Sequence, residues 1–400
     1  MSEQQSTEQQ TRANTLGILG GGQLGRMLVH AAQRMGVSTC VLDPDANAGA
    51  AQASNDAILS TYDNTMGLDA LASRCAHITT EFENVPARSL QRLSEIANTS
   101  VSPSAKAVQI AQNRVAEKQF FEQCAAQGGP GPVPWAAIES VADITKASKA
   151  LLPGILKTTQ LGYDGKGQAP VADHAGLQAA WEKLGFVPCV LEQRVDLAAE
   201  CSVVLARGHD GQVVTLPLQV NVHRNGILHT TAVGMPLPAV FGCFNPVVCE
   251  STCLNAAKNI ANALQYVGVL CVEFFVLNNG AVCVNEIAPR PHNSGHHSLD
   301  SCSLSQFELQ ARAALHWPLV EPRLHSSAMM LNLLGDLWVS HDKAPPFAKL
   351  LGLPGVHLHL YGKADARPGR KMGHVTVTGA SAAQVQATFD AVLAVLGLTA

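Results

Sequence analysis

Short apolar runs alternate with amphipathic stretches over the first hundred residues. The run TLGIL at residues 15–19 and the run STCVLD at residues 38–43 are separated by apolar residues at helical spacing, namely Leu24, Met27, Leu28, Ala31 and Met35. A similar cycle ends in AHITTEF at residues 76–82. Strands that alternate with helices in this way predict βαβ units and a parallel sheet.

The pattern changes at about residue 113 and again at about residue 320. Residues 113–320 contain short strands, hairpin signals and helices, which is typical of an α+β region, and residues 321–400 end in an alanine-rich helix. Residues 1–14 are polar and lack an apolar core, so we expect a disordered tail there. We therefore predict a Rossmann-like domain over 15–112, an α+β domain over 113–320 and a small C-terminal domain over 321–400.

Composition narrows the classes of function. The 400 residues are 47% hydrophobic and carry a net charge of −4 without a basic block, which argues against a nucleic-acid partner. No apolar run reaches the length of a membrane span, so no membrane partner is expected. The 11 cysteines are scattered and form no C-x-x-C pair, which indicates reduced thiols and a cytoplasmic location.

The first chemical motif is GGGQLG at residues 20–25. Gly20, Gly22 and Gly25 have the G-x-G-x-x-G spacing of a strand-to-helix turn that binds a phosphate. Asp43 ends the next strand, where an acid binds the ribose in a dinucleotide site. This motif fits three interpretations: the dinucleotide site of an NAD oxidoreductase, a site for another phosphate-bearing ligand, or a tight turn that binds no ligand.

A second phosphate-binding candidate is ILKTTQLGYDGKGQ at residues 155–168. Lys157 lies in an apolar strand, where an unpaired ammonium group is costly. The loop after it carries Gly162, Gly165 and Gly167. Such a loop can fold its N–H groups over phosphates while the lysine supplies charge, although an ordinary hairpin with a solvated lysine is the alternative.

Two acids lie on a predicted hairpin at residues 267–288. Asn279-Gly280 is a signal for a two-residue turn. Pairing Asn278 with Ala281 then places Glu273 directly opposite Glu286. Facing carboxylates repel unless a cation lies between them, and oxygen ligands beside phosphates favour Mg²⁺. The alternative is a surface hairpin with two solvated acids.

The segment APRPHNSGHH follows this hairpin. Arg290, His292, Asn293 and Ser294 supply hydrogen-bond donors that suit an oxyanion. A zinc site of His292, His296 and His297 is the rival interpretation, but it lacks a Cys or Glu ligand at helical spacing.

Taken together, the motifs resemble the 5-(carboxyamino)imidazole ribonucleotide synthetases, a family of the ATP-grasp superfamily. The resemblance runs from Thr15 to the C-terminus and includes GILGGGQLGRM, TTEFENVP, KTTQLGYDGKGQ, VNEIAPRPHNSGHHSLD and YGKADARPGRKMGHV. It implies an ATP-grasp fold with an N-terminal preATP-grasp domain of Rossmann type and a small C-terminal domain. The lid would lie within about residues 130–195.

The resemblance also implies roles for particular residues. It assigns Arg114 and Lys157 to the ATP phosphates, Glu200 to the ribose, His223 to the nucleotide pocket, and Glu273 and Glu286, beside Asn285, to Mg²⁺. The implied lid residues are Gly162, Tyr163, Asp164, Gly165, Lys166, Gly167 and Gln168, and the implied adenine hinge is Glu192, Gln193, Arg194 and Val195.

The implied substrate is 5-aminoimidazole ribonucleotide. Gln23, Leu24, Glu83, Asn293, Lys363, Arg370 and Lys371 would bind it, and the glycine-rich turn would belong to this substrate site. Bicarbonate would attack the γ-phosphate of ATP to form carboxyphosphate, held by Arg290 and His292 with Asn293 and Ser294 nearby. Tyr163, Asp164 and Lys166 would close over the site, and relatives of this kind imply a homodimer.

Two departures from the family pattern and two rival activities remain open at this stage. The connection GGPGPVPW is longer than usual, and KTTQLGYDG replaces a more basic segment, which puts a phosphate role at Thr159 or Gln160 in doubt. A formate-dependent glycinamide ribonucleotide formyltransferase shares the implied fold, although Asn293-Ser294 more often reads Asp-Thr there. An NAD oxidoreductase is the more distant alternative.

Overall fold

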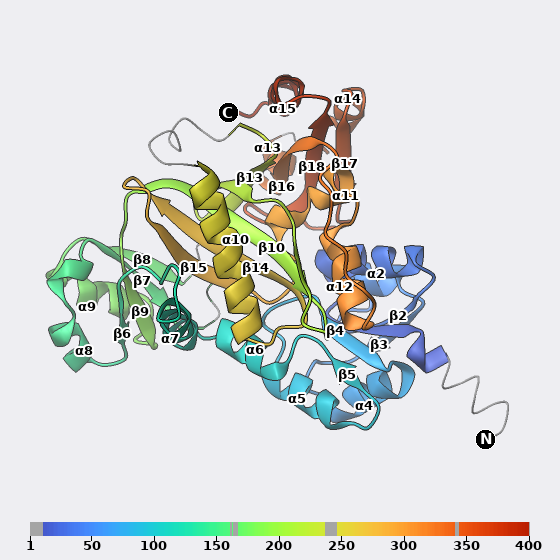
Figure 1. Ribbon diagram of the computed structural model, residues 1–400, viewed down its shortest axis with the longest axis horizontal. Coiled ribbons are helices and arrows are strands. Elements are labelled where there is room, and N and C mark those ends of the chain that lie inside the picture. Colours follow the sequence, from blue (N-terminus) through green and yellow to red (C-terminus); the bar gives the residue numbers. More distant parts are fainter. Residues whose placement is uncertain (1–10, 161, 163–166, 237–245, 341–343, 400) are drawn as a thin grey trace.

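The computed structural model describes residues 11–160, 162, 167–236, 246–340 and 344–399. Three sheets organise the chain, and they contain five, nine and four strands. The N-terminal domain, the large central sheet with its flanking small sheet, and the C-terminal unit are distinguished by colour in Figure 1.

The N-terminal domain is built on a parallel sheet in the order β3-β2-β1-β4-β5, which confirms the predicted βαβ pattern. Its strands are β1 (Thr15–Leu19), β2 (Ser38–Asp43), β3 (Asp56–Leu59), β4 (His77–Thr80) and β5 (Ser100–Val101). Its helices are α2 (Gln23–Arg34), α3 (Gly49–Ala53), α4 (Thr65–Arg74), α5 (Ala87–Glu95) and α6 (Ala105–Ala111). The strand order reverses between β1 and β4, and ligands of such sheets bind at that point.

The predicted tail is shorter than the sequence indicated. Residues 11–13 are helical, and the guanidinium of Arg12 donates to the carbonyl of Ala72 and to Thr99 Oγ1, both at 2.9 Å. Residues 11–14 therefore belong to the N-terminal domain, because Arg12 ties them to helix α4 and to the residue that precedes β5. Residues 1–10 lie outside the described residues.

The small sheet is antiparallel in the order β6-β9-β7-β8. Its elements are β6 (Trp135–Ile138), α8 (Val141–Lys146), η1 (Lys149–Leu151), β7 (Gly154–Thr158), β8 (Gln168–Val171), α9 (His174–Lys183) and β9 (Cys189–Gln193). Apolar side chains of the sheet and of α9 form a separate core that includes Leu156, Leu177, Trp181 and Leu191. This body lies within the segment predicted as the lid region.

The large sheet follows the order β15-β14-β10-β12-β13-β16-β18-β17, with β11 paired to β10. Its strands are β10 (Leu197–Arg207), β11 (Val213–Thr215), β12 (Gln219–Arg224), β13 (Ile227–Val233), β14 (Gly268–Leu277), β15 (Val282–Ala288), β16 (Ser327–Leu334), β17 (Val356–Leu360) and β18 (Lys371–Gly379). Strands β13 and β16 pair across the predicted boundary at residue 320. The C-terminal unit is therefore continuous with the central sheet, which the sequence pattern did not reveal.

Helices cover the faces of the large sheet. Helices α7 (Arg114–Ala125) and α10 (Pro246–Ala263) share one core with β10 and β14. In the C-terminal unit, α13 (Asp336–Ser340), α14 (Phe347–Leu351) and α15 (Ala382–Leu396) pack beside β16 and β18. None of the described helices is both long and apolar enough to cross a membrane.

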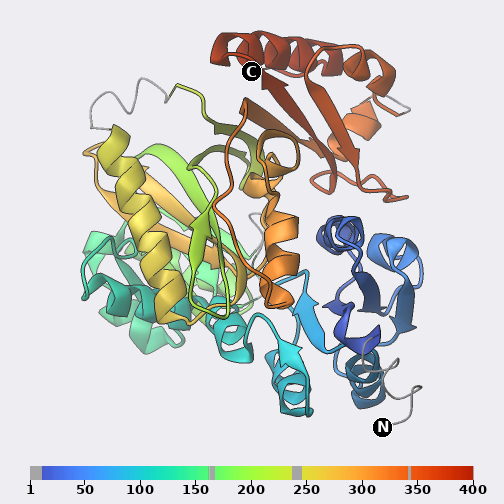
Figure 2. The same ribbon diagram turned by 45° about the vertical axis from the view of Figure 1, so that its right-hand side comes forward.

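Helix α12 (Gln306–Ala314) joins the N-terminal domain to the large sheet. Phe307 and Ala311 pack in a core with α2, whereas Leu309 and Ala313 pack with β14 on the other side. Figure 2 shows this helix standing between the two parts. The chain between β15 and α12, which contains η3 (Asn293–Gly295) and α11 (Ser298–Ser301), is thereby held where the parts of the molecule meet.

Candidate active site

Two neighbouring cavities lie at this junction. The acidic cavity, of about 150 Å³, is lined by residues that include Arg114, Glu117, His223, Glu273, Glu286 and His292. The basic cavity, of about 620 Å³, is lined by residues that include Leu24, Glu81, Lys363, Arg367 and Arg370. Both cavities are also lined by Glu83, Arg290, Asn293 and Lys371. Ligands in the two cavities would therefore lie next to each other.

The basic cavity brings together the residues predicted to bind the ribonucleotide. All of them line it: Gln23, Leu24, Glu83, Asn293, Lys363, Arg370 and Lys371. They come from the start of α2, the loop after β4, η3, the segment before β18 and the first residue of β18. Lys363 Nζ donates to the carbonyl of Lys371 at 2.8 Å, and the guanidinium of Arg370 donates to the carbonyl of Asp365 at 2.7 Å. These two hydrogen bonds lie within residues 363–371 and hold this basic segment in a defined conformation.

Sequence reasoning missed Arg367 and Glu81 in this cavity. Arg367 belongs to the same basic run as Arg370 and pairs with Asp365 at 2.9 Å. The density of basic residues in ADARPGRK was the signal that could have identified it. Glu81 follows β4 in the TTEFEN motif, and only the folded chain shows what it contacts.

The glycine-rich turn holds the protein's own carboxylates. Glu81 accepts from the N–H groups of Gly22 and Gly25 at 2.9 and 3.0 Å, at the start of α2. Asp43 accepts from the N–H of Gly21 and from the hydroxyl of Tyr62, both at 2.6 Å. Burial raises the pKa of Glu81, although its two amide partners favour the carboxylate. A ligand phosphate would have to displace these acids, so the dinucleotide interpretation of the motif does not fit the structure.

The hairpin of β14 and β15 differs from prediction at its turn. The N–H of Leu277 donates to the carbonyl of Ala281 at 2.8 Å, so residues 278–280 form the loop in place of a two-residue turn. Val276 consequently pairs with Val282, one position away from the predicted register. The prediction failed because Asn-Gly also fits a longer loop.

A bulge restores the predicted register next to the acids. The register shifts between Val272 and Phe274, so that Val272 pairs with Ile287 as the sequence argument required. Glu273 therefore lies opposite both Asn285 and Glu286. The two carboxylates line the acidic cavity together, as expected, but a bulge and not a regular ladder places them there.

The surroundings of these acids favour a cation. Partial burial opposes ionisation of Glu286, but Arg114, 2.8 Å away, and Lys157 lower its pKa to about 2. The buried Oδ1 of Asn285 has no hydrogen-bond donor among the described residues. Carboxylates and an amide oxygen without a donor are ligands that suit Mg²⁺.

A buried charge cluster connects the small sheet to α7. The carboxylate of Glu192, on β9, lies 2.6 Å from Lys157 Nζ on β7 and 3.1 Å from Lys118 Nζ. Lys118 also donates to the carbonyl of Asn285 at 2.9 Å. Burial raises the pKa of Glu192, but the two lysines outweigh it and lower the value to about 2. Lys118 was not predicted, because a lysine in a helical stretch carries no signal of burial.

Further predicted residues form ion pairs at the edge of the acidic cavity. Arg290 pairs with Glu83, and despite burial this partner lowers the pKa of Glu83. His292 Nε2 lies 3.0 Å from Glu273, and His292 Nδ1 lies 2.9 Å from the hydroxyl of Ser294. The Arg290–Glu83 pair joins the loop after β4 to the segment after β15, and the His292–Glu273 pair joins that segment to β14.

The pair of Glu200 on β10 and His223 on β12 lies 2.8 Å apart. Burial lowers the pKa of His223, but Glu200 outweighs this effect and raises it. His223 lines the acidic cavity, as a residue of a nucleotide pocket would.

The rival three-histidine site does not form. His296 Nδ1 lies 2.9 Å from Gln306 Nε2, and His297 Nδ1 lies 2.8 Å from Ser301 Oγ. Both histidines are fully buried, and among the described residues neither belongs to a group of possible metal ligands that lie within 4.8 Å of one another.

The predicted lid and hinge are only partly described. Tyr163, Asp164, Gly165 and Lys166 lie outside the described residues, whereas Gly162 lines the acidic cavity. Gly167 has a φ of +71°, and Gln168 pairs with Lys157. At the hinge, the N–H groups of Gln193 and Arg194 donate to the carbonyls of Pro134 and Pro153, both at 2.9 Å, and Val195 follows.

Comparisons with known proteins agree with this arrangement. Residues 13–112 match the ribonucleotide synthetase preATP-grasp domain, residues 125–307 the ATP-grasp domain, and residues 328–388 the phosphoribosylaminoimidazole carboxylase C-terminal domain. The chain is 42% identical over 366 residues to N5-carboxyaminoimidazole ribonucleotide synthase of Brucella melitensis biotype 1, covering 91% of this chain and 96% of that protein. This chain belongs to the N5-carboxyaminoimidazole ribonucleotide synthase family.

Solved structures of this family have the same fold. The Staphylococcus aureus N5-carboxyaminoimidazole synthetase complexed with ADP superimposes with a TM-score of 0.84 at 34% identity, covering 96% of each chain. The Aspergillus clavatus N5-carboxyaminoimidazole synthase, in complex with ADP and 5-aminoimidazole ribonucleotide, gives 0.83 at 27% identity, covering 96% of this chain and 98% of that one.

Membership in the N5-carboxyaminoimidazole ribonucleotide synthase family decides among the three activities that the sequence left open. The chain is an ATP-dependent ligase of purine biosynthesis that uses Mg²⁺, and it is neither the formyltransferase nor the oxidoreductase. The ATP-grasp fold, the preATP-grasp domain and the small C-terminal domain are confirmed.

Proposed function

We propose that this protein converts 5-aminoimidazole ribonucleotide, ATP and bicarbonate into N5-carboxyaminoimidazole ribonucleotide, ADP and phosphate. The observation that carries the proposal is the pair of adjoining cavities, one acidic and one basic, that share Arg290 and Asn293. The acidic cavity would bind the phosphates of ATP, and the basic cavity would bind the ribonucleotide. Their contact places an activated carboxyl group beside the amine that accepts it.

Mg²⁺ would be held by Glu273 and Glu286, beside Asn285, and would neutralise charge on the transferring phosphoryl group. Arg114 and Lys157 are paired with carboxylates here, and both can donate to ATP phosphates by turning their terminal groups. Glu200 would accept from the ribose hydroxyls, and the backbone of residues 192–195 would bind the adenine.

Carboxyl transfer needs a site that excludes water, because carboxyphosphate hydrolyses readily. Bicarbonate oxygen attacks the γ-phosphorus and ADP leaves, which forms carboxyphosphate. The amine of the ribonucleotide then attacks the carboxyl carbon, phosphate leaves and the amine loses a proton. Arg290 and His292 would hold the carboxyphosphate anion, with Asn293 and Ser294 at the boundary of the two cavities, and residues 162–168 would close over them.

The basic cavity would hold the phosphate of the ribonucleotide. Lys363, Arg370 and Lys371 supply charge from one wall, while Gln23 and Leu24 at the start of α2 form the opposite wall. Glu83 would face the aminoimidazole, and Arg290 fixes that carboxylate. Glu81 satisfies the amides at the start of α2, so the ribonucleotide phosphate binds the basic side chains and not the glycine-rich turn.

The decisive experiment offers purified protein, ATP and Mg²⁺ with each of two ribonucleotides, aminoimidazole or glycinamide, and each of two carbon donors, bicarbonate or formate. We expect rapid ADP release only with the aminoimidazole compound and bicarbonate. With ¹³C-bicarbonate, the label should appear as a carbamate on the product by NMR. ADP release driven by glycinamide ribonucleotide and formate would overturn the proposal.

We further propose that the chain works as a homodimer in the cytoplasm. The support is the family resemblance and the free cysteines of the described residues. Light scattering should give twice the 42.1 kDa mass of one chain. A monomer that is fully active at assay concentration would refute the dimer.

A further inference from the structure

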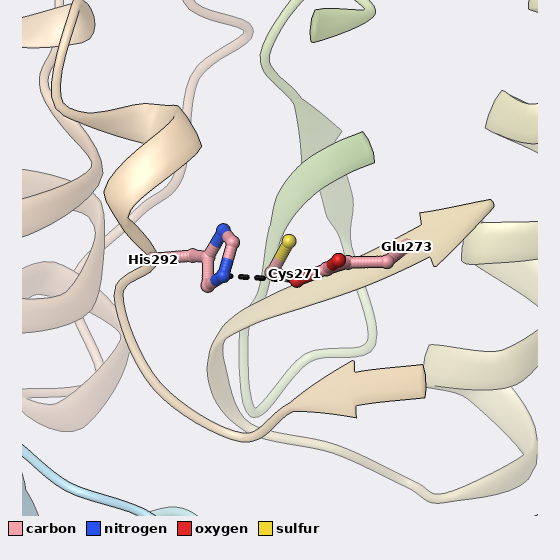
Figure 3. A group of neighbouring side chains, drawn as sticks. All are labelled: Cys271, Glu273 and His292. Atoms are coloured by element: carbon pink, nitrogen blue, oxygen red, sulfur yellow. Dashed lines mark ion pairs between the residues drawn. The ribbon is translucent and has the colours of Figure 1, made fainter. Parts of the chain in front are cut away.

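A thiol, a carboxylate and an imidazole converge on one face of the large sheet. Cys271 and Glu273 are two residues apart on β14, so their side chains leave the strand on the same face. His292 reaches the same place from the loop that follows β15. Figure 3 shows the three side chains directed toward one another.

The three ligand atoms all lie within 4.8 Å of one another, and no other such group of His, Cys, Asp and Glu occurs in the described part of the chain. His292 Nε2 and Glu273 Oε1 are 3.0 Å apart. Ligands of a tetrahedral zinc ion are about 3.5 Å apart, given bonds of about 2.0–2.3 Å. The side chains therefore need to move by only about 1 Å to enclose an ion.

The surrounding hydrogen bonds hold the imidazole in place. His292 Nδ1 lies 2.9 Å from Ser294 Oγ, which lies 2.8 Å from Ser202 Oγ on β10. Ser202 is directly opposite Glu273 in the ladder. A metal-bound histidine usually donates its other ring N–H to an acceptor, and the hydroxyl of Ser294 is placed to accept from Nδ1 when an ion holds Nε2.

The chemistry of the three groups differs from that of a magnesium site. Mg²⁺ prefers oxygen ligands in an octahedron, whereas sulfur, nitrogen and one carboxylate in a small group suit Zn²⁺ and similar ions. The thiol of Cys271 is fully buried, and no step of the proposed reaction uses it.

We propose that Cys271, Glu273 and His292 form an inhibitory site for a thiophilic divalent ion, with Zn²⁺ as the ion to test. Binding releases the thiol proton to solvent. The imidazole proton moves from Nε2, which faces Glu273, to Nδ1, which faces the hydroxyl of Ser294, so that the ion takes the lone pair of Nε2. Inhibition rests on the proposed function, because Glu273 is also a proposed Mg²⁺ ligand and His292 a proposed carboxyphosphate ligand. An ion bound here removes both from the reaction.

Binding can be tested without turnover. Co²⁺ added to the whole protein, with no ATP or ribonucleotide present, should produce a thiolate-to-cobalt charge-transfer band. The band should be lost in Cys271→Ala and in Cys271→Ser. The serine variant nearly conserves the volume of the side chain, so it removes the thiol without opening a cavity. Cys201→Ala is the matched control, because Cys201 is equally buried on the neighbouring strand but faces the opposite core.

Affinity and inhibition complete the test. Competition with a chromophoric chelator should show that Cys271→Ser weakens Zn²⁺ binding by more than about 100-fold, since even outer-shell changes cost about 10- to 100-fold. Zn²⁺ should inhibit turnover by the wild type and by Cys201→Ala, with the rate of each protein normalised to its own rate without zinc. Excess Mg²⁺ should relieve this inhibition. A cobalt band that is absent in the wild type, or persists in both Cys271 variants, would overturn the site.

The outcomes separate this proposal from the proposed function. The cobalt band is read in the absence of substrates, so it holds or fails whatever reaction the protein catalyses. If the band forms as expected while Zn²⁺ leaves turnover unchanged, the ion binds but the inhibitory role is refuted.

Discussion

The charge cluster around Glu192 allows a quantitative prediction. Its carboxylate is 3% exposed and lies between the ammonium groups of Lys118 and Lys157, which are 0% and 12% exposed. The substitution Glu192→Gln keeps the shape of the side chain and removes its charge. Two buried lysines then face each other without the shared anion.

The magnitude follows from the lowered pKa. A change from 4.5 to about 2 corresponds, at about 1.36 kcal/mol per pKa unit, to about 3 kcal/mol of folding free energy. Because the folded-state pKa is the lower one, this contribution is fully present above the ordinary pKa and is lost as pH falls through about 2. Removing one partner of a buried ion pair costs a similar amount, about 3–5 kcal/mol. We therefore expect a loss of about 3 kcal/mol at pH 7.

Urea unfolding measures this loss, with hydrogen exchange of the β9 amides to locate it. Trp135 and Trp181 report on the small sheet. A double-mutant cycle with Lys118→Met should give a coupling energy of at least about 1 kcal/mol, because the two groups are in contact. The control is Glu182→Gln on the exposed side of α9, expected to change stability by less than about 0.5 kcal/mol. A loss below about 1 kcal/mol for Glu192→Gln, with additive double-mutant energies, would refute the reasoning.

Three further changes test the cavities and the glycine-rich turn. Glu286→Gln should lower the rate of ATP turnover at least tenfold in a coupled ADP assay, because a carboxylate ligand for Mg²⁺ is lost; a normal rate would contradict the metal assignment. Arg370→Ala should raise the KM for the ribonucleotide roughly 10- to 100-fold with little change in the KM for ATP, and equal effects on both would argue against a phosphate contact. Gly22→Ala should lower the melting temperature, because the added Cβ would lie 2.6 Å from Glu81 Oε1. Gly176→Ala is the control and should not lower it, because the nearest atom to its Cβ is 3.5 Å away. Equal melting temperatures for the two variants would contradict the prediction and show that Glu81 can move away from the turn.

Local features of this protein could be predicted from its sequence. The βαβ pattern of residues 15–82 predicts the parallel sheet, because strand and helix periods are set by which side chains face a core. Glu273 and Glu286 were assigned to one hairpin because both apolar strands and the Asn-Gly turn signal are contiguous in sequence. The family resemblance and the implied reaction also rest on contiguous motifs.

Only the tertiary structure decided how distant segments meet. The bulge that places Glu273 opposite Glu286 depends on the pairing of a whole ladder, and turn residues alone did not determine its register. Glu81 accepts from the N–H groups of Gly22 and Gly25 from more than 50 residues away, so a ligand phosphate would have to displace this carboxylate to bind there. Lys118 became part of the site only when α7 packed against β9 and β15.

The basic cavity shows most clearly that the site depends on how distant segments pack. Its lining runs from Gln23 to Lys371, and the pairing of β13 with β16 carries the C-terminal segment to the N-terminal domain. Periodicity records which face of each element is buried, because burial is a property of single positions. It does not record which buried face meets which, because that choice depends on the packing of all the elements together.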